Sequence, residues 1–192
     1  MKKFIVCTWW THVWKTSVLE YLENEWYKRH ISVAWKNMDM LNYYMWEEKY
    51  REWRTTNFLD FQRMNIFKDF ELYIDSFNIN DSKDEIIFFD RWIFDWVASL
   101  KRENINIPLE IEELISNIKY YSKVFIFEPI WFHEQREQTW RLLNEEISLK
   151  WAKYIEEEYV NRWYEIVKVP NIIWKNPTDS IKKRAEYLKN NL

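Results

Sequence analysis

Residues Thr8–Ser17 read T-W-W-T-H-V-W-K-T-S and are the most informative part of this sequence. This stretch follows the apolar run Phe4–Cys7, which is typical of a strand buried on both faces. A strand, a short turn and Lys-Thr at the start of an amphipathic segment form the setting of the pattern G-x-x-x-x-G-K-S/T. Both glycines of that pattern are tryptophan here, at Trp9 and Trp14. The stretch therefore has the surroundings of the pattern without its glycines.

Glycine is missing from the whole chain, and tryptophan is frequent: Gly 0 and Trp 14 in 192 residues. A globular protein of this length has roughly 13 glycines, at about 7%. Trp26 and Trp163 stand where a helical pattern stops and a strand pattern follows, at a C′ position that favours glycine because it needs a positive φ. A naturally tryptophan-rich protein explains the count but not this placement. We infer, as a hypothesis, a parent sequence in which most or all glycines are replaced by tryptophan, with Trp53 the best candidate for an original tryptophan.

Length, charge and cysteine content narrow the class of protein. The 192 residues suffice for one sizeable domain and are short for two, so we expect a single domain over 1–192. A net charge of -3 and a pI near 5.8 argue against a general nucleic-acid binder. The single cysteine, Cys7, excludes a disulfide framework and fits a reducing compartment. No apolar run approaches the ~18 residues of a membrane span, so we expect a cytoplasmic protein without membrane or nucleic-acid partners.

Apolar runs alternate with amphipathic segments along the chain. The runs predict strands at 3–7, 30–34, 85–89, 123–127 and 165–169. The amphipathic segments predict helices at about 15–25, 37–54 and 57–77, two helices between 92 and 120 separated by a loop that ends at Pro108, and helices at about 141–161 and 178–190. Strands that alternate with helices predict an α/β domain with a mainly parallel sheet.

The stretch 8–17, called the phosphate loop from here on, has a chemistry of its own. In such a loop, successive backbone N–H groups converge on a phosphate at the positive end of the following helix. Lys15 is expected to reach the β- and γ-phosphates, and the Thr16 hydroxyl to bind Mg²⁺. With tryptophan standing for glycine the pattern is highly specific, whereas without glycines an ordinary strand-to-helix turn is the alternative. The candidate nucleotide-binding residues in it are Trp9, Trp10, Thr11, His12, Val13, Trp14, Lys15, Thr16 and Ser17.

Four parts of the sequence share features with a known family. They are the phosphate loop, the strand that ends Phe88-Phe89-Asp90-Arg91, the strand 124–127 that leads into an arginine-bearing segment, and the C-terminal part from Trp163 to Lys183-Arg184-Ala185-Glu186. Over nearly its full length the chain resembles the AAA-like ATPase and kinase domains of the P-loop NTPases, a group related to nucleoside, nucleotide and nicotinamide riboside kinases. The resemblance implies a three-layer α/β fold, with a mainly parallel five-stranded sheet between helices and a nucleotide at the carboxyl ends of the strands.

The resemblance also assigns catalytic roles to Lys15, Asp90 and Arg136. Asp90 looks like the family's strand-end carboxylate, which orders Mg²⁺ through water or takes the proton of the acceptor. The same residue can also be a helix N-cap, since aspartate is favoured there. Thr16 and Asp90 are the implied metal-binding residues.

Arginines complete the implied site. Arg91 resembles a phosphate or acceptor contact, with a surface ion pair as the alternative. Arg136 and Arg141 resemble arginines of a lid segment, at about 128–141, that neutralise charge on the transferred phosphoryl group. Their alternative is the solvated face of a polar segment. Asp95 is expected either to orient the acceptor or to cap a turn.

Taken together, the resemblance implies an enzyme that uses ATP (or GTP) and Mg²⁺ to transfer the γ-phosphoryl group to a small-molecule acceptor or to water. The alternative is a nucleotide-binding regulatory switch with little catalysis, which needs the phosphate loop more than Asp90 and Arg136. A phosphate loop without glycine argues against nucleotide binding by the chain as written. The sequence names neither the acceptor nor the oligomeric state.

Overall fold

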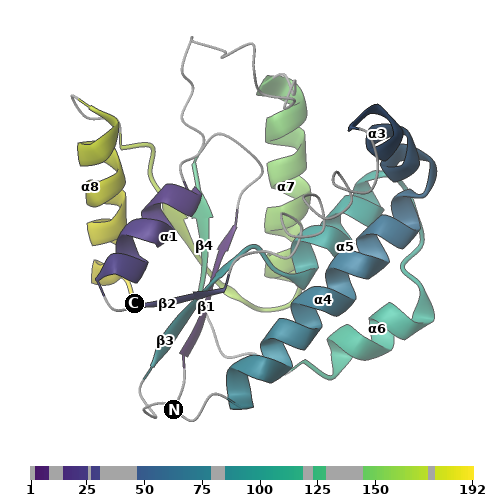
Figure 1. Cartoon of the computed structure of the whole chain (residues 1–192), viewed down its shortest axis with the longest axis horizontal. Helices are drawn as coiled ribbons and strands as arrows, with labels where there is room; N and C mark the ends of the chain where they lie inside the picture. Colours follow the sequence, from purple (N-terminus) through teal and green to yellow (C-terminus); the bar gives the residue numbers. More distant parts are fainter. Residues whose placement is uncertain are drawn as a thin grey trace.

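The computed structural model describes residues 3–8, 15–25, 27–30, 47–78, 85–118, 123–128, 145–172 and 176–192. Strands and helices alternate through most of this part of the chain (Figure 1). The strands are β1 (Lys3–Thr8), β2 (Lys28–His30), β3 (Ile86–Asp90), β4 (Lys123–Phe127) and β5 (Glu165–Val169). The helices are α1 (Lys15–Asn24), α3 (Glu47–Thr56), α4 (Phe58–Asn78), α5 (Ile93–Arg102), α6 (Leu109–Ser116), α7 (Glu145–Asn161) and α8 (Pro177–Asn190).

The strands form one sheet in the order β2-β3-β1-β4-β5, and every pair of neighbours is parallel. β1 lies in the middle, with Val6 beside Phe89 of β3 and Val124 of β4. The run Phe4–Cys7 is buried throughout, because a central strand of a covered parallel sheet has no face in water. The predicted parallel five-stranded sheet is confirmed.

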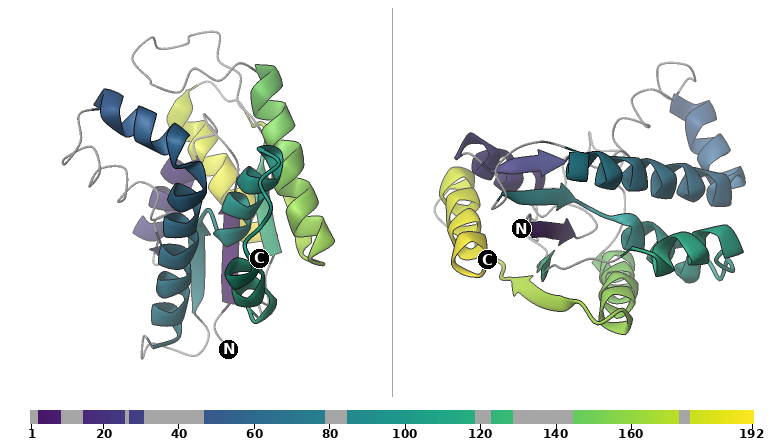
Figure 2. Two further views of the ribbon diagram at one scale, coloured as in Figure 1. Left: turned by 90° about the vertical axis from the view of Figure 1, so that its right-hand side faces the viewer. Right: turned by 90° about the horizontal axis from the view of Figure 1, so that it is seen from below.

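Helices cover both faces of this sheet, which gives three layers. α1 and α8 lie together on one face, and α4, α5 and α7 lie on the other (Figures 1 and 2). Leu19 and Leu22 of α1 and Phe94 and Val97 of α5 are buried with the strand side chains in a common core. None of the helices in the described part of the chain has the length and apolarity of a membrane span. The predicted three-layer α/β fold is thus confirmed.

Some predicted boundaries differ from the structure. The strand expected at 30–34 begins earlier, at Lys28, because pairing with Ile87–Phe89 of β3 sets its register. The helix expected to reach about residue 120 ends at Ser116, where the N–H of Asn117 donates back to the carbonyl of Leu114. Residues 31–46, which hold the start of the helix expected at 37–54, and the expected lid segment beyond residue 128 lie outside the described residues.

Three helices, α1, α5 and α7, end with the same hydrogen bond, in which an N–H reaches back five residues to a carbonyl. The donors are Tyr27, Ile105 and Tyr164, and the acceptors are Leu22, Leu100 and Tyr159. Such a bond closes around a C′ residue in the left-handed region, usually glycine or asparagine. Asn104 and Trp163 hold this place in α5 and α7, with φ of 55° and 64°. In α1 the place belongs to Trp26, which lies outside the described residues.

Candidate functional site

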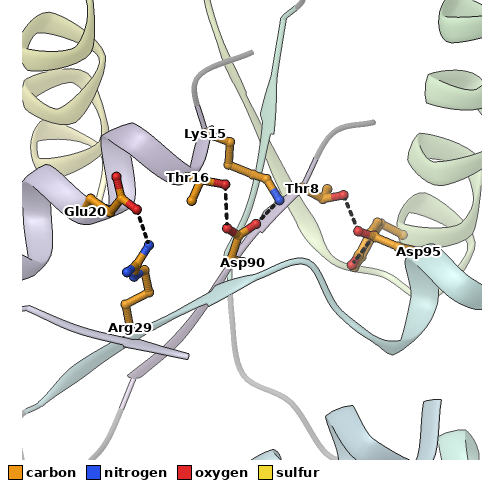
Figure 3. Close-up of polar contacts among 8 residues, drawn as sticks. Thr8, Lys15, Thr16, Glu20, Arg29, Asp90 and Asp95 are labelled. Atoms are coloured by element: carbon orange, nitrogen blue, oxygen red, sulfur yellow. Dashed lines mark hydrogen bonds and ion pairs between the residues drawn. The ribbon is translucent and has the colours of Figure 1, made fainter. Parts of the chain in front are cut away.

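The carboxyl ends of β1 and β3 lie side by side in the middle of the sheet and carry polar residues. Thr8 ends β1, Asp90 ends β3 beside Cys7, and Lys15 begins α1. In parallel sheets of this kind, ligands bind beyond the carboxyl ends of the strands, where helix N-termini also point. Figure 3 shows the side chains of Thr8, Lys15, Thr16, Asp90 and Asp95 gathered at this edge.

Lys15 and Thr16, the first two residues of α1, both bind the carboxylate of Asp90. Nζ of Lys15 forms an ion pair with Oδ1, and the Thr16 hydroxyl donates to Oδ2 at 2.9 Å (Figure 3). The side chains of Lys15 and Asp90 are only 6% and 2% exposed. A buried charge without a partner is strongly unfavourable. Because each charge has a partner, the ion pair keeps the Lys15 ammonium buried at the start of α1.

Burial and pairing together set the protonation of this pair. Burial lowers the pKa of the Lys15 ammonium, against the charge of Asp90, which raises it. Burial alone raises the pKa of the Asp90 carboxyl, but the charge and hydrogen bond of Lys15, with Arg91 and Thr16, outweigh burial and hold that pKa below its usual range. Asp90 is therefore a carboxylate at neutral pH, suited to binding cations.

Asp95, in the first turn of α5, forms a second buried polar cluster at the same edge. Its Oδ2 accepts a hydrogen bond from the Thr8 hydroxyl at 2.6 Å, and its Oδ1 accepts one from the Tyr159 hydroxyl at 2.9 Å. The side chain is 3% exposed. Burial raises the pKa of Asp95, although Thr8, Arg91, Lys15 and Tyr159 all act against the rise.

Arg91 follows Asp90 directly and has a positive φ of 75°. Its N–H donates to the carbonyl of Cys7 at 2.9 Å, which extends the contact between β1 and β3 by one residue. Its guanidinium carbon lies 5.6 Å from the ring centre of Trp96. A non-glycine residue in the left-handed region is strained by roughly 1–2 kcal/mol, and strain of this kind clusters at functional sites.

The hydroxyl of Thr16 and the carboxylate of Asp90 form an oxygen donor set that suits Mg²⁺. In nucleotide sites Mg²⁺ keeps several waters and takes one or two protein oxygens together with substrate phosphates. Here the two protein groups already touch, at 2.9 Å. No group of three or more His, Cys, Asp or Glu that could hold a metal ion occurs among the described residues. The Thr16 hydroxyl and the Asp90 carboxylate are thus the oxygen donors that lie together at this edge of the sheet.

Among the predicted site residues, the structure brings Lys15, Thr16 and Asp90 together. Arg91 lies beside them at the end of β3, and Ser17 lies in the first turn of α1. The remaining predicted residues lie outside the described part of the chain: Trp9, Trp10, Thr11, His12, Val13, Trp14, Arg136 and Arg141.

Sequence reasoning missed two members of the second cluster, Thr8 and Tyr159. The sequence pattern makes Thr8 only the first residue of the phosphate loop, although a hydroxyl at the end of a buried strand is a signal that can mark such a residue. Tyr159 is 64 positions from Asp95 in the chain and has no local signal. Only the packing of α7 against α5 brings it there.

Comparisons with known proteins agree with the fold. A family model described as AAA domain matches residues 12–176. Among solved structures, the fold is similar to the NadR protein in complex with NR, at 12% identity and a TM-score of 0.63, over 98% of this chain and 49% of that one. It is also similar to deoxyadenosine kinase from M. mycoides with bound dATP, at 14% identity and a TM-score of 0.62, over 100% of this chain and 98% of that one. The chain thus spans about half of the first relative and nearly all of the second. No curated protein matches the sequence.

Proposed function

Because the chain belongs to the AAA domain family, we propose that its parent scaffold binds ATP with Mg²⁺ at Lys15, Thr16 and Asp90. We further propose that it transfers the γ-phosphoryl group to a small-molecule acceptor. The proposal also covers GTP as the nucleotide and water as the acceptor. We propose as well that residues 1–192 form a single domain, and that Arg136 and Arg141 act as arginines of a lid segment.

One observation carries the proposal: a buried lysine and a hydroxyl at the start of α1 converge on the carboxylate that ends the neighbouring strand β3. In an ordinary strand-to-helix turn a buried lysine is not expected, because burying a charge is unfavourable. In a polyphosphate site it is expected, because the ligand binds a fixed cation at a helix N-terminus.

The geometry divides the roles among the three residues. The Lys15 ammonium has three N–H donors, so it can hold Asp90 and still donate to a phosphate oxygen. Thr16 and Asp90 supply oxygens for Mg²⁺, which when bound neutralises charge on the phosphates. A lowered pKa makes Asp90 a weak base, which favours its role as a cation ligand over its role as acceptor of a proton.

The test uses two proteins: the chain as written, and a glycine form with glycine at Trp9, Trp10, Trp14, Trp26 and Trp163. Each is incubated with Mg²⁺, γ-labelled ATP and a panel of deoxynucleosides, nucleosides, vitamins and sugars. We expect the glycine form to label at least one acceptor. We expect Lys15→Ala to lower that rate by about 100-fold or more, the scale of losing one charge-stabilising contact.

A matched control is Lys68→Ala, which removes an exposed lysine of α4 that pairs with Glu71 on its own helix. It should leave the rate unchanged. If the glycine form binds ATP but labels no product, or binds a partner in a nucleotide-dependent way instead, the regulatory switch is favoured. Labelling that survives Lys15→Ala would contradict the proposed site.

A further inference from the structure

The two ends of the phosphate loop are each held by a different carboxylate. The loop leaves β1 at Thr8, whose hydroxyl donates to Oδ2 of Asp95 at 2.6 Å. It enters α1 at Lys15 and Thr16, which bind Asp90. Asp90 is the last residue of β3 and Asp95 lies in the first turn of α5, so the two carboxylates flank the short connection between β3 and α5. The residues on the two sides of this connection therefore hold both ends of the loop (Figure 3).

Asp95 is itself held in one orientation. Its second oxygen accepts the Tyr159 hydroxyl at 2.9 Å. With both carboxylate oxygens hydrogen-bonded and the side chain 3% exposed, the carboxylate cannot turn to another partner without leaving a buried hydroxyl unsatisfied. The link from α7 through Asp95 to Thr8 is therefore a rigid one.

These contacts favour a structural role for Asp95 over the acceptor contact that the sequence also allows. Both oxygens of Asp95 already accept hydrogen bonds from buried protein hydroxyls. A cap needs a side-chain bond to the free N–H groups of α5, but the N-cap residue of α5 is Trp92 and no side-chain cap bond is formed there.

We infer that Asp95 is a positioning residue: it fixes the end of β1 through Thr8 and so sets where the phosphate loop begins relative to Lys15. The inference rests on the proposed function, since the fixed ends matter only if the loop binds phosphate. Backbone donors bind phosphate well when they are held in place before the ligand arrives. A loop with a displaced end loses that arrangement and binds the nucleotide less tightly.

Thr8→Val tests the inference, because valine keeps the shape of threonine and replaces its hydroxyl with a methyl group. Without nucleotide, we expect faster amide hydrogen exchange in the peptide that covers Lys3–Thr8. In the glycine form, the KM for ATP should rise about tenfold while kcat changes less than about twofold, the pattern of lost ground-state binding. Thr8→Ser keeps a hydroxyl, so its amide exchange and its KM for ATP should both match those of the protein with Thr8.

Ser99→Ala is the matched control, since it also removes one buried hydroxyl bond around Asp95 but has no link to β1. It should change neither the exchange nor the KM. Equal effects of Thr8→Val and Ser99→Ala, or no recovery in Thr8→Ser, would overturn the positioning role. A glycine form that does not turn over ATP, but whose β1 exchange still rises in Thr8→Val, would refute the proposed function and leave the anchoring of β1 supported.

Discussion

Trp163, Trp96 and Trp92 carry the same side chain in three different surroundings. Trp163 is 95% exposed and has a left-handed backbone. Trp96 is buried, and its indole N–H donates to Oδ2 of Asp69 at 2.5 Å. Trp92 is buried with an extended backbone, and its ring packs edge-on against Phe89, 4.9 Å away between centres. Only Trp163 of these three stands where the backbone favours glycine, which is why the glycine form keeps the other two.

Trp163→Gly should stabilise the chain. The left-handed conformation costs a non-glycine residue roughly 1–2 kcal/mol, and an exposed indole contributes little packing in return. Trp163→Ala is the control, because it removes the indole but keeps the Cβ that causes the strain. We expect urea unfolding to give the glycine variant about 1 kcal/mol more stability than the alanine variant. Equal stability of the two variants would mean that position 163 has no need of glycine.

At the scale of elements, one arginine connects α8 to the ends of β4 and β5. Nη2 of Arg184 donates to the carbonyl of Glu128 at 2.8 Å and, more weakly, to that of Val169 at 3.4 Å. The guanidinium carbon lies 5.0 Å from the ring centre of Phe127. Burial lowers the pKa of Arg184 to about 10, against the charge of Glu128. Its hydrogen bonds therefore lie where β4 ends and the expected lid segment begins.

Arg184→Leu should destabilise the chain through this contact. The substitution keeps the apolar part of the side chain and leaves the carbonyl of Glu128 without its charged donor, a loss of about 2–3 kcal/mol. Lys182→Ala, on the exposed side of α8, should change the unfolding free energy by less than about 0.5 kcal/mol. Thermal and urea unfolding of the two variants measure the difference. If both variants unfold alike, the contact of Arg184 with the strand ends does not contribute to stability.

The strands were predictable and some of the contacts between elements were not. The runs that contain Phe4–Cys7 and Ile86–Phe89 are apolar without a break, and such runs form strands only in a sheet covered on both faces. Lys15, Thr16 and Asp90 could be placed together because a strand end and a helix start meet at one edge of a parallel sheet. The bond from Tyr159 to Asp95 depends on how two helices pack, which no local pattern records.

In the whole molecule, the arrangement of the layers determines where the site lies. α1 and α8 lie on one face of the sheet, and α4, α5 and α7 lie on the other (Figure 2). The polar residues of β1, β3 and α1 gather at the carboxyl ends, where Lys15 and Asp90 form their buried pair. In the proposed function, this pair is the core of a site for Mg²⁺ and ATP, and glycines in the phosphate loop are needed for binding.

The direct test of this site is titration calorimetry with ATP and Mg²⁺. Three proteins are compared: the chain as written, the glycine form, and the glycine form with Lys15→Ala. For the glycine form we predict a Kd in the micromolar range, which corresponds to a binding free energy of about −8 kcal/mol. We predict much weaker binding for the other two proteins. The chain as written lacks the shape of the loop, and the Lys15→Ala variant lacks the charge that contacts phosphate. Equal affinity of the chain as written and the glycine form, or tight binding that survives Lys15→Ala, would contradict this prediction.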